Sequence, residues 1–194
     1  LFNGRPLTIL WIAENADAII EGWLLGSRSG DAIADVILGR HNPSGKLPVS
    51  FPVSVGQIPV YYNHFSTGRP YLGDGANFVS KYRDIPNEPL YPFGFGLSYT
   101  NFSYSDLTLS AKKMRMDDTL QVKATLKNTG NYDGKEVVQL YIQDMVASTV
   151  RPVKELRGIQ KVFLAAGEEK EISFNISKED LSFYNDALEF VAEP

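Results

Sequence analysis

The chain has 194 residues, of which 43% are hydrophobic and 22% charged, a balance typical of a globular protein with room for one large or two small domains. Its net charge of −4, without a basic cluster, argues against nucleic-acid binding. The absence of cysteine excludes disulfides, thiol nucleophiles and zinc–thiolate sites. No apolar run approaches the roughly 18 residues that span a bilayer, so we expect no membrane partner.

Two apolar runs, residues 7–12 and 18–25, open the chain, and both have the length of a buried strand. Two such strands followed by a glycine loop and a helix indicate an open, mostly parallel α/β sheet. Because only one clear helix is present, the sequence predicts a remnant of such a sheet rather than a complete domain. The first residue, Leu1, suggests a cut through a longer chain.

A glycine loop at residues 26–30 leads into a predicted helix over residues 31–38. Asp31 suits the positive end of the helix dipole, and Gly39 stands where a left-handed C-terminal cap belongs. Prolines and a glycine within residues 43–48 then favour an extended path. The apolar face of this helix consists of Ala32, Ile33, Val36 and Ile37.

Residues 53–103 are rich in aromatic residues, proline and glycine. Disordered segments are poor in aromatics, and proline lowers the entropy of the unfolded chain, so we expect this segment to be an ordered wrap between two domains. Beyond residue 102 the hydrophobic period changes to two, which indicates an antiparallel β-sandwich. The clearest alternating strands cover residues 119–127, 136–142 and 171–176, and residues 178–181 form at most one helical turn.

Several motifs in the chain resemble the C-terminal part of glycoside hydrolase family 3 enzymes, and most of all the bacterial periplasmic β-glucosidases. The resemblance covers essentially the whole chain. The motifs are Trp23–Val36, Asn42–Pro52, Gln57–Asn63, Thr67–Pro70, Pro89–Thr100, Asn128–Gly130 and Val150–Gly158.

This resemblance implies an enzyme with an N-terminal barrel, an α/β sandwich and a fibronectin type III-like domain. The fold class is therefore α/β plus all-β. The implied domains are residues 1–56 as the C-terminal part of the α/β sandwich, residues 57–103 as the wrap, and residues 104–194 as a fibronectin type III-like domain without its last strand. Ser27, Arg28 and Ser29 depart from the family, because relatives commonly carry an acidic residue there.

The family hydrolyses β-glycosides with retention, using a nucleophilic carboxylate and an acid/base carboxylate. The resemblance places both upstream of this chain, so no catalytic residue is assigned here. Candidate substrate contacts lie in the glycine loop and in the aromatic wrap, where rings can pack on the C–H faces of sugars. These candidates are Arg28, Tyr61, Tyr62, His64, Asp74 and Tyr82. Packing at a domain interface is the alternative role for the aromatic residues.

We expect no cofactor and no metal, because neither His41 nor His64 has a partner at metal-ligand spacing. The sequence therefore predicts the C-terminal portion of a retaining β-glucosidase, periplasmic or secreted, whose partners are a β-glucoside or β-linked oligosaccharide and the missing upstream domains. A carbohydrate-binding module and a structural spacer that forms a homodimer remain as alternatives.

Overall fold

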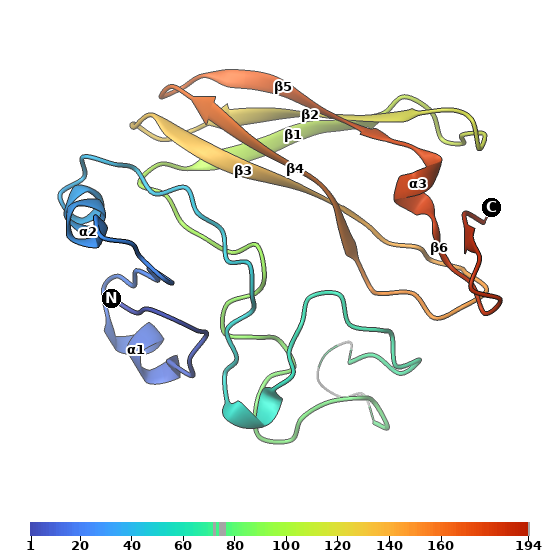
Figure 1. Cartoon of the computed structure of the whole chain (residues 1–194), viewed down its shortest axis with the longest axis horizontal. Helices are drawn as coiled ribbons and strands as arrows, with labels where there is room; N and C mark the ends of the chain where they lie inside the picture. Colours follow the sequence, from blue (N-terminus) through green and yellow to red (C-terminus); the bar gives the residue numbers. More distant parts are fainter. Residues whose placement is uncertain (72, 74–76, 194) are drawn as a thin grey trace. The chain divides into compact units, whose positions relative to one another are not determined.

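The computed structural model describes residues 1–71, 73 and 77–193, and the chain divides into two compact units, Leu1–Leu97 and Ser98–Pro194 (Figure 1). The first unit contains two α-helices and a short 3₁₀-helix. The second consists mainly of β-strands. In the described part of the chain, every helix falls short of the length and apolar content needed to cross a membrane.

Helix α1 covers Leu10–Asn15, where the sequence predicted a buried strand at residues 7–12. That prediction is wrong. Backbone bonds from Ala13 N to Ile9 O and from Ala16 N to Ile12 O, each of 2.9 Å, close the helical turns. A short apolar run does not distinguish a strand from a helix, and the good helix formers that follow it favour the helix.

The sequence predicted a second buried strand at residues 18–25, and that prediction is wrong. The segment forms an isolated parallel bridge in which Glu21 lies beside Phe2, the φ of +51° at Trp23 interrupts an extended path, and Leu24 and Leu25 are exposed. Phe2 N donates to Ile20 O at 2.9 Å, and Gly22 N donates to Phe2 O at 2.8 Å. Of the parallel sheet expected for this segment, the structure therefore contains a single bridge.

Helix α2, Ser29–Ile37, confirms the helix predicted after the glycine loop and begins two residues earlier than expected. Its C-cap is Leu38, and the next residue, Gly39, has a φ of +70°. Gly39 N donates to Val36 O at 3.0 Å. Only glycine adopts this left-handed conformation without a steric penalty, which explains the end of the helix.

Two segments that lie far apart in the sequence pair within the first unit. Phe51 and Tyr91 form an antiparallel bridge with N–O distances of 2.8 and 3.3 Å. Four residues away, Leu47 N donates to Phe95 O, and Leu47 O accepts from Gly94 N, both at 2.7 Å. The extended path predicted after α2 is therefore held by the segment at residues 91–95.

Aromatic side chains reinforce this pairing. The Phe51 ring meets Trp23 and Tyr91 edge to face, with centroid distances of 6.1 and 6.3 Å, and Tyr91 stacks on Phe95 at 5.0 Å. Such edge and stacked pairs add to the energy of apolar burial.

The second unit contains a three-stranded sheet in the order β1-β2-β5 and a two-stranded sheet of β3 and β4, all antiparallel. A short hairpin of β6 and β7 follows helix α3 (Figure 1). The bounds are β1 Phe102–Leu109, β2 Leu120–Asn128, β3 Gly134–Ile142, β4 Glu155–Leu164, β5 Glu169–Ile176, α3 Lys178–Leu181, β6 Phe183–Tyr184 and β7 Phe190–Val191. The three alternating strands predicted from the sequence are confirmed as β2, β3 and β5.

One hydrophobic cluster joins the two larger sheets. Leu126 of β2 and Leu164 of β4 are completely buried, and Val138 of β3 and Ile172 of β5 pack with them. They alternate with less buried neighbours, which is the period of two that the sequence displays.

Asn128 at the end of β2 is a buried amide that ties four groups together. Its Oδ1 accepts from Thr100 Oγ1 at 2.6 Å and from Gly130 N at 3.1 Å. Its Nδ2 donates to the carbonyls of Tyr132, at 2.8 Å, and Leu164, at 3.3 Å. The amide therefore satisfies backbone groups that the turn would otherwise leave unpaired.

Tyr104 and Glu136 connect the two larger sheets by a hydrogen bond, in which the phenol donates to Oε1 at 3.2 Å. Burial, followed by the charge and hydrogen bond of the Glu136 carboxylate, raises the pKa of Tyr104 well above its ordinary value. The phenol therefore stays protonated and remains a donor over the whole physiological range.

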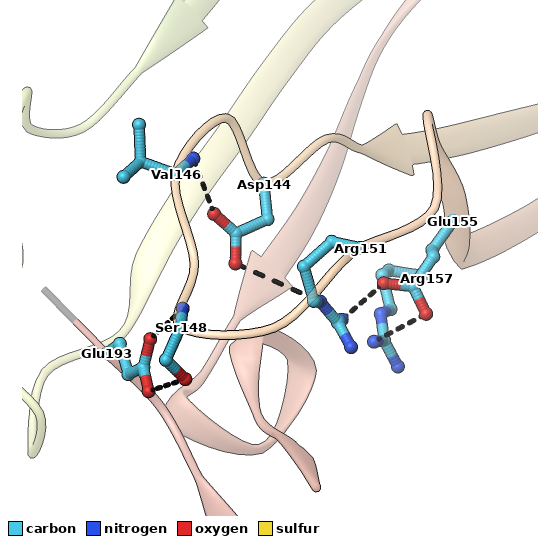
Figure 2. Close-up of polar contacts among 7 residues, drawn as sticks. All are labelled: Asp144, Val146, Ser148, Arg151, Glu155, Arg157 and Glu193. Atoms are coloured by element: carbon cyan, nitrogen blue, oxygen red, sulfur yellow. Dashed lines mark hydrogen bonds and ion pairs between the residues drawn. The ribbon is translucent and has the colours of Figure 1, made fainter. Parts of the chain in front are cut away.

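The loop between β3 and β4 is anchored at two places, which Figure 2 shows. Near its base, the Arg151 guanidinium lies 2.5 Å from Glu155 Oε2 and 3.9 Å from Asp144 Oδ2, and stacks 4.4 Å from the centre of the Phe183 ring. Glu155 also pairs with Arg157 at 3.2 Å.

The second anchor of this loop is Ser148, which is tied to Glu193. Its backbone N donates to Glu193 Oε2 at 2.8 Å, and its hydroxyl donates to Oε1 at 2.5 Å (Figure 2). The hydroxyl bond first, and then the backbone bond, hold the pKa of Glu193 below its ordinary value. A lowered folded-state pKa means that this contact stabilises the fold fully above the unfolded-state pKa and is lost as the pH falls through the folded-state pKa.

We predict that the Ser148 amide resonance titrates with the Glu193 carboxylate, with a midpoint below that of an ordinary glutamate. Ser148→Ala removes the hydroxyl donor and should raise this midpoint toward the ordinary value. Ser105→Ala, which removes a hydroxyl bonded to Asp106 instead, should leave it unchanged. An NMR pH titration measures the midpoint in the wild-type chain and in both variants. A wild-type midpoint at or above that of an ordinary glutamate would contradict the assignment.

Candidate functional site

A buried glutamine closes the aromatic wrap. Gln57 ends the 3₁₀-helix Val55–Gln57 and is only 2% exposed. Its Oε1 accepts from Val53 N at 2.9 Å, while its Nε2 lies 3.1, 3.2 and 3.0 Å from the carbonyls of Pro86, Asn87 and Glu88. Because Nε2 carries only two hydrogens, the three carbonyls share them. This one amide therefore fixes both ends of the segment at residues 58–85.

Asn87 organises the returning limb of the wrap. Its Oδ1 accepts from Tyr82 N at 3.0 Å, and its Nδ2 donates to Ser80 O at 2.8 Å. Ser80 N in turn donates to Arg69 O at 2.9 Å, beside a parallel bridge with Pro70. The described part of the wrap is thus held by backbone and amide hydrogen bonds, as expected for an ordered segment.

A pocket of about 220 Å³ lies where the wrap begins. Tyr62 and Phe93 stack at its wall, with centroids 4.2 Å apart and an interplanar angle of 18°. Ser50 fixes the position of Phe93, because its Oγ accepts from Phe93 N at 3.1 Å. The lining residues are Pro48, Val49, Ser50, Val60, Tyr61, Tyr62, Asn63 and Phe93.

The aromatic wall of this pocket could receive the mostly apolar face of a small ring. Aromatic walls accept the C–H face of a sugar ring, and a few polar groups at the rim orient it. Tyr61, which is 55% exposed, and Asn63 are among the lining residues, but the surface of the pocket itself is almost entirely apolar. Among the described residues, no group of three or more His, Asp and Glu is placed to hold a metal ion.

Of the singled-out residues that the structure describes, Tyr61 and Tyr62 line the same pocket. Arg28 precedes α2, its side chain is 86% exposed, and its Nε lies 2.5 Å from Asp31 Oδ2. His64 is exposed, with Nδ1 3.1 Å from Phe65 O, and Tyr82 contributes its backbone to the Asn87 contact. Asp74 lies outside the described residues. The substrate-binding roles of these six residues remain predictions.

The structure gives Phe93 and Gln57 roles that the sequence analysis did not predict. Phe93 lay only within the motif Pro89–Thr100, and the structure stacks it on Tyr62 and places it in the wall of the pocket. Gln57 was noticed only within a family motif. Its one local signal is its place just before an isoleucine–proline pair, which does not reveal that its partners lie about 30 residues away.

Comparison with known proteins identifies the family of the chain. The model of the glycosyl hydrolase family 3 C-terminal domain matches residues 1–99, which is more than half of the chain. The chain belongs to glycoside hydrolase family 3. A fibronectin type III-like domain model matches residues 136–194. Together these matches confirm the predicted fold class, while the boundaries of the predicted domains at residues 1–56, 57–103 and 104–194 remain predictions.

Three relatives within family 3 illustrate the similarity. A periplasmic β-glucosidase of Salmonella typhimurium is 52% identical over all of this chain, and β-glucosidase BoGH3A of Bacteroides ovatus is 41% identical. The crystal structure of a Listeria innocua β-glucosidase in complex with glucose superimposes with a TM-score of 0.95 at 51% identity over the whole chain. The chain covers 26%, 27% and 27% of these proteins, about a quarter of each.

We predict that Gln57→Ala lowers the free energy of unfolding by about 1–3 kcal/mol, because it leaves the Val53 amide and three carbonyls without their partner. Gln57→Glu should also destabilise, since it keeps the acceptor for Val53 but turns a carboxylate oxygen toward the three carbonyls. Gln143→Ala removes an exposed glutamine and serves as the control. Denaturant unfolding measures the differences, and Gln57→Ala unfolding like the control would contradict the role.

Proposed function

We propose that this chain is the C-terminal region of a retaining β-glucosidase that releases terminal β-linked glucose from oligosaccharides or glucosides. The observation that carries the proposal is the 52% identity, over the whole chain, with a protein named periplasmic β-glucosidase. The same relative supports a periplasmic or secreted location. The Listeria enzyme, solved in complexes with glucose and with laminaribiose, supports a β-glucoside as substrate.

The chain's own role in this proposal is to support the catalytic region rather than to supply its chemistry. Retaining hydrolysis needs a nucleophilic and an acid/base carboxylate about 5 Å apart. We infer that both belong to the three quarters of the enzyme outside this chain. The buried amides of Gln57 and Asn128 suit a scaffold, because each fixes several backbone groups with uncharged hydrogen bonds.

The aromatic pocket suggests that this scaffold also borders the substrate. Its volume of about 220 Å³ suits one ring rather than an oligosaccharide. We infer that Tyr61 and the stacked pair of Tyr62 and Phe93 contact the leaving-group sugar in the complete enzyme. The same pocket supports a second candidate, a carbohydrate-binding module that acts without catalysis.

The isolated 194-residue chain should leave an aryl β-glucoside unhydrolysed, while the complete enzyme that contains it releases the aryl group. Turnover by the isolated chain above the buffer background would contradict the division of labour. The same preparation, titrated with cellobiose while tyrosine and tryptophan fluorescence are recorded, tests the second candidate. A saturable change would favour a binding module, and no change would favour the scaffold.

In the complete enzyme, Tyr61→Ala should raise the KM for cellobiose by about tenfold through the loss of ring contacts. The KM for an aryl glucoside, which has no second sugar, should change less. Tyr132→Ala removes a similarly exposed tyrosine of the second unit and serves as the matched control. Steady-state kinetics with both substrates measure the effect, and an unchanged KM for cellobiose would remove Tyr61 from the sugar site.

A further inference from the structure

Glu21 has a buried carboxylate oxygen that no described residue satisfies. Its Oε1 accepts from Trp23 N at 2.8 Å, but its Oε2 is buried without a hydrogen-bond donor in the part of the chain that the structure describes. Burying an ionised oxygen away from water without a partner is costly, so proteins pair such groups. The position of Glu21 therefore implies a partner.

The backbone around Glu21 holds this carboxylate in a defined place. Phe2 bonds to the residues on either side of Glu21 in the parallel bridge. Trp23 has a φ of +51°, in the left-handed region that a bulky residue rarely adopts. At Gly22, a Cβ atom would lie 2.6 Å from Oδ1 of the Asn3 side chain, which follows Phe2 in the chain.

The cations of the same unit are engaged elsewhere or make no ion pair with Glu21 in the part that the structure describes. Arg28 pairs with Asp31 at 2.5 Å, and Arg40 pairs with Asp35 at 3.7 Å. Lys46 donates to Gly96 O at 2.8 Å. The single bond from Trp23 satisfies one oxygen of Glu21 and leaves the charge of the carboxylate unbalanced.

The position of Glu21 in the fold indicates where its partner would come from. It stands at the carboxyl end of the short parallel pairing with Phe2, just before the glycine loop and α2. In open α/β sheets this edge is where loops converge and ligands or neighbouring segments meet the sheet. A donor that reaches Glu21 would therefore come from a segment that packs against this edge.

We propose that Glu21 Oε2 forms an ion pair with an arginine or lysine side chain supplied by the region of the enzyme outside these 194 residues. The inference rests on the proposed function, in which this chain is one part of a longer β-glucosidase. The charge left on Glu21 selects a cationic partner over a neutral donor, because a buried carboxylate is stabilised far more by a cation. The ion pair joins that region to the segment around the Phe2–Glu21 bridge.

The test uses the complete enzyme and its thermal unfolding. Glu21→Gln keeps the shape of the side chain and the acceptor for Trp23 N, but removes the charge. It should lower the Tm by about 5 °C, because it leaves a buried cation without its counterion. Glu21→Asp keeps the charge and should recover at least half of that loss. Glu14→Gln removes one exposed negative charge from the same unit and should leave the Tm unchanged.

A Glu21→Gln variant that unfolds at the wild-type Tm would overturn the proposal, because the oxygen would then meet only water or a neutral donor. Equal losses in Glu21→Gln and Glu21→Asp would also overturn it. So would a raised KM at an unchanged Tm, which would assign Glu21 to the substrate. If Glu21→Gln fails to fold, soluble Glu21→Asp supports the proposal and insoluble Glu21→Asp refutes it. The Tm comparison does not depend on activity, so a complete enzyme inactive on β-glucosides would refute only the proposed function.

Discussion

The first unit depends on the pairing of residues 47–51 with residues 91–95. Backbone groups that leave water must find partners, and these two segments find them in each other. The pairing is close: at Gly96 a Cβ atom would lie 2.2 Å from the Gly45 carbonyl oxygen, so any larger residue would force the segments apart. Everything between the segments becomes a closed loop, and the aromatic pocket forms where that loop starts.

Both units use a buried side-chain amide at the point where a loop returns to the fold. Gln57 joins the two ends of the wrap, and Asn128 joins the end of β2 to the segments around Thr100 and Leu164. An amide carries donors and acceptors together, so it can satisfy several backbone groups without the desolvation cost of a charge. These contacts favour a rigid framework at both places.

The aromatic pocket and Glu21 suit different binding partners. The pocket offers stacked rings and an almost entirely apolar surface, which suits the C–H face of a ring. Glu21 offers a partly buried carboxylate with one unsatisfied oxygen, which suits a cationic side chain as its partner. In the proposed enzyme, one region of the chain would thus contact the substrate while another holds the adjoining polypeptide.

The sequence alone determined those features that rest on local patterns. The period of two predicted β2, β3 and β5, and the apolar face followed by Gly39 predicted α2, because neighbouring residues set these elements. The long family motifs identified the family for the same reason. The apolar run at residues 7–12 has no clear period, and its strand prediction was wrong. Only the tertiary structure decided that Phe93 joins Tyr61 and Tyr62, and that Glu21 keeps an unsatisfied oxygen, since both depend on contacts between distant segments.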